Sequence, residues 1–557
     1  MPGEDRTDKG WAELSGRRSG GLLKKLYPFR NVFTLIVALY LVLATGVATA
    51  AVHVMHGRSG LDMSLGFSPS NAAPMTASTP KYLVLFVLDG ARPDYFGLTK
   101  LPHVDSLIEH GTQFTSAFDG ILEAETPAGH TTIATGSKPS RDGILGFNWE
   151  QNDEGYSIFN PDVVRAGAMT DIMESRGVPT IAGLYKARFP GAKVVALSGS
   201  KYYAADPLGG PDADAILYYH GDAKGRFIPD SMPGHVPPAA VLKAPGLIWP
   251  TTVHLPLGLE DNLATKMGLS AIHVMHPRIL LINYPEFDWP LGHVDGGNVD
   301  PSGAKILMKT FDKNLAAIEK VYRKEGILSK TLFVITADHG MKPVARFIPQ
   351  TVITNAITQA GTSSPTTAYD TACYVWLQDS TKAQAVADDI WNTKDPGVAS
   401  VYYLNAQLHY QLAGGSFVTP EVDTANHYLL NSLINGHEPN VVAFSKNGNT
   451  FSNSTTNWKG DHGGAEWASE HMPLIISGPG IQQDVVTAQP AQLEDIAPTV
   501  LDDMGVTPSG MQGHVLTDAL IKSSVQDQHI RAREARKLSP MIGALIAQQD
   551  YEQANGS

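Results

Sequence analysis

Carboxylate and imidazole side chains gather around the ends of several apolar runs in this sequence. Asp89 ends the run "LVLFVLD", and two later runs are each followed by an aspartate and a histidine. A further such pair comes shortly before the last apolar run. In open α/β sheets ligands bind beyond the carboxyl ends of the strands, so these residues are the candidates for chemistry. The paired residues are Asp288 and His293, Asp338 and His339, and Asp461 and His462.

The chemistry that this set favours is metal binding. A lone Asp-Gly after a strand is a common turn, so the joint pattern carries the prediction. Aspartates and histidines, with Cys373 as the one cysteine of the chain, offer oxygen and nitrogen ligands but no thiolate cluster. Such ligands suit Zn²⁺, with Mn²⁺ or Fe possible. Their number fits two ions, which is the usual arrangement for an in-line displacement at phosphorus.

A two-metal site of this kind also needs a nucleophile, and Thr126 is the candidate. It precedes a Pro-Ala-Gly turn and the helix-like stretch "HTTIATG". A hydroxyl at a helix N-terminus can sit on a metal, and the backbone N–H groups there suit phosphate oxygens. The alternative is that Thr126 is a plain helix N-cap.

These residues must be positioned by a sheet that is covered on both faces. The apolar runs lack alternation, which is typical of buried strands, and amphipathic stretches such as residues 303–326 lie between them. The pattern predicts an α/β fold with a central, mostly parallel sheet. The expected strands are residues 81–89, 180–185, 193–199, 279–286, 331–338 and 472–478.

Three segments interrupt or follow this alternation. Residues 206–270 are rich in Pro, Gly and Asp and indicate a cap insertion. Residues 343–456 mix one helix-like stretch with strand-like pieces and indicate a small α+β insertion. The segment 523–557 is polar and helix-prone and is expected to form a C-terminal tail.

The motifs, in their order along the chain, resemble those of the alkaline phosphatase superfamily, specifically its type I phosphodiesterase/nucleotide pyrophosphatase family. The resemblance spans about residues 81–520 and implies an alkaline-phosphatase-like three-layer sandwich with cap insertions, here assigned to a hydrolase domain over 81–522. The motifs are "LDGARPDY", "TPAGHTTIATG", Asp288 with His293, "ADHGM", "DHGG", "PLIISGPGI" and "LEDIAPTVLDDMGV".

The resemblance assigns roles to individual residues. Thr126 matches the nucleophile of the family, and Asp461 falls outside the ligand set because the family ligand in "DHGG" is the histidine. The two zinc positions are matched by Asp89, Thr126, Asp338 and His339 for one ion, and by Asp288, His293 and His462 for the other.

Three departures from the family pattern concern the loop geometry and the substrate. Four residues, not the usual three, separate Asp288 from His293. Gly129 stands where the diesterase branch often has an asparagine that touches phosphate, and Asn148 is the candidate substitute. Lys201 is present, but Tyr203 replaces the arginine that completes a Lys-x-Arg pair in phosphomonoesterases. Losing one charged donor costs about 1.5–3 kcal/mol of dianion recognition, which favours diesters.

The function implied by the resemblance is hydrolysis of a small-molecule phosphate ester or diester through a phosphothreonine intermediate, with two zinc ions. Alternatives are a phosphomonoesterase, a phosphonate hydrolase and a membrane-anchored phospho-group transferase. The physiological substrate and the oligomeric state cannot be predicted from the residues. With 42 basic and 55 acidic residues the formal charge is −13, and no basic stripe with interleaved aromatics indicates a nucleic-acid surface.

The N-terminal region predicts export from the cytoplasm. Residues 31–55 contain no charged side chain and are long enough for a transmembrane signal anchor. Basic residues enriched in 1–30 predict a cytoplasmic N-terminus and an extracytoplasmic catalytic domain at the cell membrane. Residues 56–80 read as a flexible linker. The alternative is a cleaved signal peptide and a secreted protein, since Ala48-Thr49-Ala50 resembles a cleavage site.

Overall fold

The computed structural model describes residues 79–221, 226–243, 247–248, 256–296 and 301–555. These residues belong to one compact unit, Thr76–Ser557. The segments expected as cytoplasmic (1–30) and transmembrane (31–55), and nearly all of the linker (56–80), lie outside the described residues. Within the described part of the chain, no helix has both the length and the apolar character needed to cross a bilayer.

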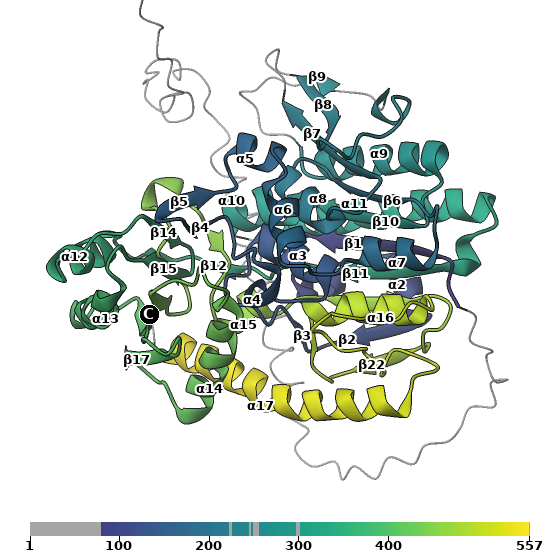
Figure 1. Ribbon diagram of the computed structural model, residues 1–557. Coiled ribbons are helices and arrows are strands. Elements are labelled where there is room, and N and C mark those ends of the chain that lie inside the picture. Colours follow the sequence, from purple (N-terminus) through teal and green to yellow (C-terminus); the bar gives the residue numbers. More distant parts are fainter. Residues whose placement is uncertain (1–78, 222–225, 244–246, 249–255, 297–300, 556–557) are drawn as a thin grey trace, which may run out of the picture. The chain divides into compact units, whose positions relative to one another are not determined.

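A ten-stranded mixed sheet forms the centre of this unit (Figure 1). Its middle strands β11, β1, β10, β6 and β7 run parallel to one another. On one side β21 pairs antiparallel with β11, and on the other side β8 pairs antiparallel with β7. In order across the sheet the strands are β22 (Val485–Thr487), β2 (Gly111–Phe114), β21 (Leu474–Ser477), β11 (Thr331–Thr336), β1 (Tyr82–Leu88), β10 (Ile279–Tyr284), β6 (Val194–Ser198), β7 (Ala215–Gly221), β8 (Arg226–Ser231) and β9 (Leu247–Ile248).

Helices cover both faces of the sheet and make the three layers of a sandwich (Figure 1). This cover explains the unbroken apolar runs, since every residue from Leu83 to Leu88 in β1 is fully buried. One face carries α2 (Pro102–Glu109), α9 (Leu259–Met275) and α11 (Pro301–Lys324), and the other carries α3 (Thr126–Thr135), α7 (Ile181–Arg188), α8 (Tyr202–Gly209) and α16 (Ile496–Asp503).

One expected strand is a helix. Residues 180–185 read as an apolar run, but Ile181–Arg188 form α7. The hydroxyl of Thr180 accepts a hydrogen bond from Gly183 N, which is the N-cap geometry that starts a helix. The prediction of a strand here was wrong because a short apolar run does not distinguish a strand from a buried helix segment, and the N-cap signal went unused.

The segment expected as an α+β insertion contains a second, five-stranded antiparallel sheet with its own apolar core. Cys373 is buried in the second of its strands, where it is a free thiol. The strand order is β14 (Thr366–Tyr369), β15 (Ala372–Trp376), β18 (Val441–Ser445), β16 (Val398–Leu404) and β17 (Tyr410–Gly415), with α12 (Thr351–Gln359), α13 (Ala383–Asn392) and α14 (Pro420–Leu430) packed around them.

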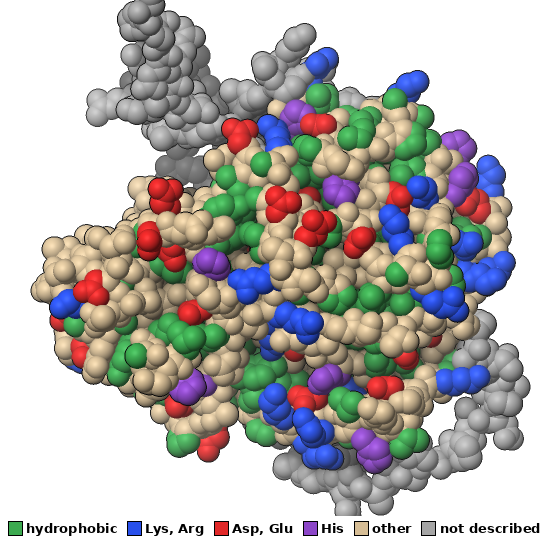
Figure 2. All heavy atoms as spheres, viewed as in Figure 1, with side chains coloured by type: hydrophobic (Ala, Val, Ile, Leu, Met, Phe, Trp, Pro, Cys, Tyr) green, Lys and Arg blue, Asp and Glu red, His purple; other side chains and the backbone are tan. Residues whose placement is uncertain are grey.

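The segment 206–270, expected as a cap, contributes β7, β8 and β9 to one edge of the central sheet. The C-terminal segment is helical, as its composition suggests, and forms α17 (Val525–Asn555) against α14 and α15 (Trp467–Glu470). On the face shown in Figure 2, Lys and Arg side chains are scattered among acidic and apolar ones. Smaller elements are α4 (Pro139–Asp142), α5 (Pro161–Arg165), α6 (Ala168–Ser175), β4 (Asn148–Gln151) and β5 (Glu154–Ser157).

Candidate active site

The carboxyl ends of three neighbouring parallel strands bring the predicted residues together. Strand β1 lies between β10 and β11, with Leu88 opposite Tyr284 and Val87 opposite Thr336. Asp89 therefore leaves β1 beside the loop that carries Asp288 and the loop that carries Asp338. All three carboxylates are buried, with exposed fractions of 0%, 4% and 0%. Burying three carboxylates together at one edge of the sheet costs free energy, which indicates that they bind a cation.

The extra residue between Asp288 and His293 lies in a turn over Asp288–Gly292 whose backbone leaves helical geometry at Trp289 (φ −123°, ψ 118°). The His293 amide donates a hydrogen bond to the Asp288 carbonyl and closes this turn. His293 Nε2 thereby comes 3.2 Å from Asp288 Oδ1. The longer spacing therefore keeps this pair of side chains in contact.

Thr126 is the first helical residue of α3, so it does not cap the helix. The N-cap is Glu125, whose side chain makes no capping bond. The hydroxyl of Thr126 is buried and lies 3.4 Å from Asp89 Oδ1. The start of α3 thereby directs a hydroxyl group at the carboxylates.

The three predicted histidines share one arrangement. In each ring Nδ1 lies within hydrogen-bond distance of a backbone carbonyl: Gly460 for His293, Gly340 for His339 and Ala124 for His462. Because a carbonyl can only accept, Nδ1 carries the hydrogen and Nε2 is left with its lone pair. Carbonyl partners of this kind typically orient metal-ligating histidines.

The free nitrogens face the buried carboxylates, and the donor set fits two metal ions. The donor atoms of Asp288, His293 and His462 lie within 4.8 Å of one another, as do those of Asp89, Asp288 and His339. Three buried atoms of the predicted ligands, Asp288 Oδ1, Asp338 Oδ2 and His339 Nε2, have no hydrogen-bond partner. Mixed carboxylate and imidazole donors suit Zn²⁺. The structure therefore gathers all six predicted Asp and His ligands, with Thr126, in one place.

Lys201 lies in the middle of this site. Its Nζ is 2.7 Å from Asp89 Oδ1, 2.6 Å from Asp288 Oδ2 and 3.4 Å from Thr126 Oγ1. Although burial lowers the pKa of this ammonium, Asp288 and Asp89 raise it well above its ordinary value. A permanent positive charge therefore stands beside the candidate nucleophile.

The two carboxylates that Lys201 touches differ in their proton affinity. Burial and the neighbouring Asp338 raise the pKa of Asp89 to about 6. Burial acts in the same direction on Asp288, but Lys201 and then His293 outweigh it and hold its pKa well below the usual range. Both groups are mainly ionised at neutral pH, and Asp89 is the better proton acceptor.

Two contributors to the site were missed by the sequence reasoning, namely His130 and Asn283. Asn283 Nδ2 lies 2.7 Å from Asp89 Oδ2 and 3.0 Å from His130 Nε2. His130 Nδ1 in turn donates to the Thr126 carbonyl at 2.7 Å. The available signals were a polar residue inside the apolar run "ILLINY" and a histidine one helical turn after Thr126. Together they fix the orientation of the Asp89 carboxylate relative to α3.

The residues expected to bind substrate occupy different places. A Cβ at Gly129 would lie 2.5 Å from the Asp338 carbonyl oxygen, so this position lets α3 approach the Asp338 loop and leaves no room for a side chain. Asn148 and Tyr203 both line a cavity of about 260 Å³ beside the site. Asp461 accepts hydrogen bonds from Thr450 and Ser452 and lies behind His293.

Aromatic rings form much of the wall of this cavity. Phe147 stacks on Phe159 with ring centroids 4.0 Å apart, and Tyr203 meets Phe147 edge-on at 5.0 Å. Trp289, Tyr369 and Trp458 also contribute aromatic rings to the lining, which includes Asp288, His293 and His462. The arrangement can hold the apolar or aromatic part of an ester next to the metal-binding residues.

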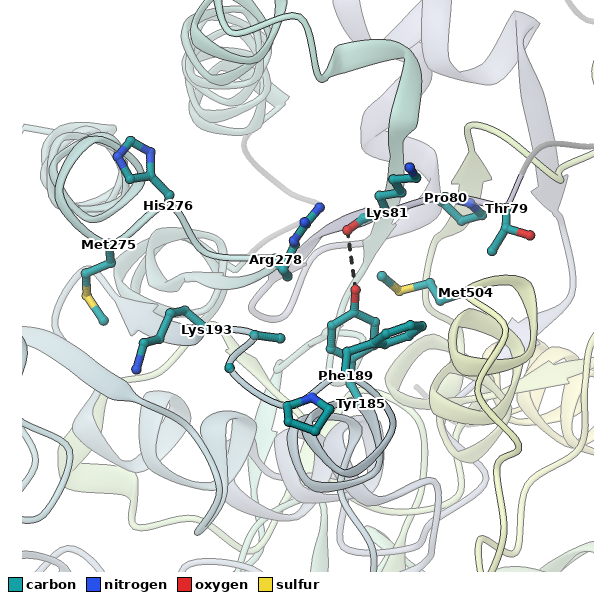
Figure 3. Close-up of a pocket in the computed structure, with 13 residues that line it drawn as sticks. Thr79, Pro80, Lys81, Tyr185, Phe189, Lys193, Met275, His276, Arg278 and Met504 are labelled. Atoms are coloured by element: carbon teal, nitrogen blue, oxygen red, sulfur yellow. Dashed lines mark hydrogen bonds between the residues drawn. The ribbon is translucent and has the colours of Figure 1, made fainter.

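A larger cavity, of about 670 Å³, lies away from this chemistry. Figure 3 shows its lining, which includes Lys81, Tyr185, Lys193 and Arg278 around the amino ends of β1, β6 and β10. None of the predicted site residues reaches it. The smaller cavity is therefore the candidate substrate site, because it is the one that adjoins the buried ligands.

The fold and the site together define a member of the alkaline phosphatase superfamily. Within it, the chain belongs to the type I phosphodiesterase/nucleotide pyrophosphatase family, whose model matches residues 83–465. The resemblance inferred from the ordered motifs is thereby confirmed.

Individual relatives agree with this assignment. Alkaline phosphatase PhoK from a Sphingomonas species is 32% identical over 161 residues, which cover 27% of this chain and 29% of PhoK. The crystal structure of alkaline phosphatase PafA superposes with a TM-score of 0.62 at 18% identity, covering 80% of this chain and 100% of PafA. Murine ectonucleotide pyrophosphatase/phosphodiesterase 5 gives a TM-score of 0.55 at 14% identity, covering 79% and 100%. The structural matches show the fold.

Proposed function

We propose that this protein hydrolyses phosphate esters, with diesters preferred, through a phosphothreonine formed on Thr126. The family and the names of its relatives support a phosphoester hydrolase. The observation that carries the assignment is the position of Thr126 Oγ1, which is 3.4 Å from both Asp89 Oδ1 and Lys201 Nζ. A hydroxyl held between a carboxylate and an ammonium, among metal-type donors, is poised for attack on phosphorus.

Two divalent ions, Zn²⁺ being favoured by the donor set, would supply Lewis-acid stabilisation of the charge that develops on the attacking, leaving and non-bridging oxygens. Asp89, Thr126, Asp338 and His339 would hold one ion, and Asp288, His293 and His462 the other.

The residues of the chain account for the order of events. Thr126 Oγ attacks phosphorus in line, its proton passing toward Asp89 Oδ1, and the P–O bond to the leaving group breaks. Lys201 Nζ holds a non-bridging phosphate oxygen. Water then attacks the phosphothreonine from the side vacated by the leaving group, and the P–Oγ bond breaks. Asp89 returns its proton to Thr126 Oγ, the proton lost by the water passes through solvent to the departed leaving group, and phosphate or a monoester is released.

The preference for diesters rests on the cavity wall. Tyr203 places a neutral aromatic ring where a second cation would bind the extra charge of a monoester, and Phe147 and Phe159 offer a surface for an aromatic group. AMP is bound in a structure of an inactive form of murine ectonucleotide pyrophosphatase/phosphodiesterase 5, which shares this fold. AMP itself is a monoester, so the support for a diester that carries a nucleoside or another aromatic group comes from the aromatic wall of the cavity.

The test replaces the nucleophile and compares two substrates. Thr126→Ala is expected to lower kcat by more than about a thousandfold, because no covalent intermediate can form. Turnover of bis-p-nitrophenyl phosphate and p-nitrophenyl phosphate measures the effect and the diester preference together.

Thr126→Ser is the matched control, since it keeps the hydroxyl group and should keep most of the activity. The zinc content of the alanine variant should stay near that of the wild type. Full activity in Thr126→Ala would rule out the nucleophile assignment.

We also propose that residues 31–55 anchor the protein in the cell membrane with the hydrolase outside the cytoplasm. The support is the uncharged length of this segment and the basic residues before it. Fractionation of cells expressing the full chain, followed by protease treatment of intact cells, tests it. Recovery of the protein from the cytoplasm would contradict it.

A further inference from the structure

A second group of acidic side chains lies beside the active site and is not used by the proposed mechanism. Glu123 and Glu125 are on the segment that leads into α3, and Asp370 is in the turn between β14 and β15 of the insertion. One carboxylate oxygen from each residue lies within 4.8 Å of those from the other two. The segment with Glu123 and Glu125 and the turn with Asp370 are about 250 residues apart in sequence, yet their three carboxylates lie together.

All three carboxylates are removed from water, with exposed fractions of 0% for Glu123, 4% for Glu125 and 9% for Asp370. Among the described residues, no Lys or Arg forms an ion pair with any of them. Burying unpaired carboxylates is costly, so the group needs either protons or a bound cation. The electrostatic repulsion among the three carboxylates likewise requires protons or a cation.

An independent observation points to a ligand. Neither oxygen of Glu123 has a hydrogen-bond partner, whereas the carboxyl groups of Asp370 and Glu125 lie within hydrogen-bond contact of each other. Glu125 also accepts from the Phe147 amide and is held in place. A fully buried carboxylate with both oxygens free, directed at two other carboxylates, has the donor atoms for bidentate coordination.

The surrounding backbone is shaped to allow this convergence. A Cβ on Gly146 would lie 2.5 Å from both Glu123 Oε1 and Glu125 Oε2. Because Gly146 has no side chain, the carboxylates of Glu123 and Glu125 can occupy the space beside it and approach each other.

We propose that Glu123, Glu125 and Asp370 form a third cation site, separate from the two sites that contain histidines. This site binds a hard divalent ion, with Ca²⁺ preferred over Mg²⁺. The donors are oxygen only, which suits Ca²⁺ or Mg²⁺ and disfavours Zn²⁺ relative to the histidine-containing clusters. Ca²⁺ fits better than Mg²⁺ because it accepts bidentate carboxylates and irregular geometry.

The site would have a structural consequence for catalysis. Glu125 is the N-cap of α3 and directly precedes Thr126, whereas Asp370 belongs to the inserted sheet. Both also line the aromatic cavity. A cation between them would fasten the start of the nucleophile helix to the insertion and set the width of the cavity.

The experiment measures binding directly, so its result does not depend on the proposed hydrolytic activity. The full-length protein is loaded with Zn²⁺ and Ca²⁺, freed of unbound metal and analysed by elemental mass spectrometry. The expected result is one equivalent of Ca²⁺ in addition to the zinc. Glu123→Gln and Asp370→Asn should each weaken Ca²⁺ binding by at least about 10-fold while leaving the zinc in place.

Asp206→Asn is the matched control. Asp206 is buried with an unpaired oxygen, but it has no carboxylate beside it, so this variant should keep the Ca²⁺. Terbium luminescence provides a second readout on the wild type. Burial, followed by the nearby carboxylates of Glu123 and Asp370, raises the pKa of Tyr374 well above its ordinary value, so this tyrosine lies close to the proposed site. It should sensitise the emission of bound Tb³⁺, and the emission should fall when Ca²⁺ displaces the Tb³⁺.

Two results would overturn the proposal. One is a wild-type protein that retains no Ca²⁺ or Mg²⁺, gives no Tb³⁺ signal and unfolds at the same temperature with and without millimolar Ca²⁺, which would identify a protonated acid cluster. The other is a Glu123→Gln variant with undiminished Ca²⁺ content. If the variants fail to fold, the wild-type measurements alone decide.

Discussion

Lys201 and Tyr203 stand two residues apart at the start of α8, and they set the charge offered to a phosphate group. Lys201 contacts both Asp89 and Asp288, whereas Tyr203 packs against Phe147 and lines the cavity. One cation and one neutral ring therefore face the substrate where two cations would recognise a dianion. We therefore propose that Tyr203 sets the preference between monoesters and diesters.

Replacing that side chain should shift the preference. Tyr203→Arg adds a charged donor, which is worth about 1.5–3 kcal/mol. The ratio of kcat/KM for p-nitrophenyl phosphate to that for bis-p-nitrophenyl phosphate is expected to rise at least about 10-fold. Tyr202→Arg is the control, because Tyr202 does not line the cavity. An unchanged ratio in Tyr203→Arg would show that Tyr203 does not determine the charge preference.

For individual residues, the sequence was most informative where the residue type alone indicates a chemical role, as aspartate and histidine indicate metal binding. The aspartates and histidines that follow apolar runs meet in the structure as expected. Asn283 and His130 were missed because their role comes from contact with Asp89 and Thr126, which residue spacing does not reveal. Asp370 approaches Glu123 through tertiary folding alone, so no local pattern could have paired them.

Helix α3 is the element that decides how close the nucleophile comes to the carboxylates. Gly129 lies one turn into it and packs directly on the backbone of Asp338. This close approach explains why the position carries no side chain, although relatives in the diesterase branch often have an asparagine there. Because Gly129 has no Cβ, α3 can lie this close to the loop that carries Asp338.

Adding that Cβ should push the helix away. Gly129→Ala places a methyl group 2.5 Å from the Asp338 carbonyl oxygen, so we expect a loss of about 1–3 kcal/mol in the free energy of unfolding and a lower kcat. Urea denaturation and steady-state kinetics measure the two effects.

Gly543→Ala is the comparison, since Gly543 lies within α17 with no atom near its added Cβ. It should stabilise the protein by about 0.5–1 kcal/mol, the ordinary helix propensity gain. Equal effects of the two substitutions would contradict the packing argument.

The order of elements was largely readable from the sequence, but their directions and partners were not. The apolar runs at 81–89, 193–199, 279–286 and 331–338 are the parallel centre of the sheet. The run at 472–478 contributes β21, which is antiparallel to β11, and composition carries no information on strand direction. Residues 206–270 were separated from the sheet on the basis of their Pro and Gly content, yet β7 and β8 extend it.

Across the whole molecule, α17 connects parts that are distant in sequence. Its first half buries Arg531, which binds Asp518 through Nε and Nη2 and the Pro490 carbonyl through Nη1. Its second half reaches the insertion, where Glu552 accepts a hydrogen bond from Asn447 N. Gln549 accepts one from Ala468 N of α15, outside the insertion. The helix therefore fastens the insertion to the main sheet.

Removing the buried charge should weaken that connection. Arg531→Met is expected to lower the free energy of unfolding by about 2 kcal/mol, less than for a fully buried pair because Asp518 keeps some contact with solvent. Arg533→Met, at an exposed position of the same helix, should change stability by no more than about 0.5 kcal/mol. Calorimetry of both variants checks this. Equal stabilities would mean that α17 contributes little to the connection.

The larger cavity and the aromatic cavity described above lie at opposite ends of β1. The larger one surrounds Thr79 to Lys81, where the described chain begins, and the aromatic one adjoins Asp288 beyond the far end of the sheet. The seven residues of β1 span roughly 23 Å between them. The described chain therefore begins at the end of β1 opposite the candidate active site. A fluorescent label attached at Thr79 would sit about one strand length away from the reacting ester and would leave the aromatic cavity uncovered.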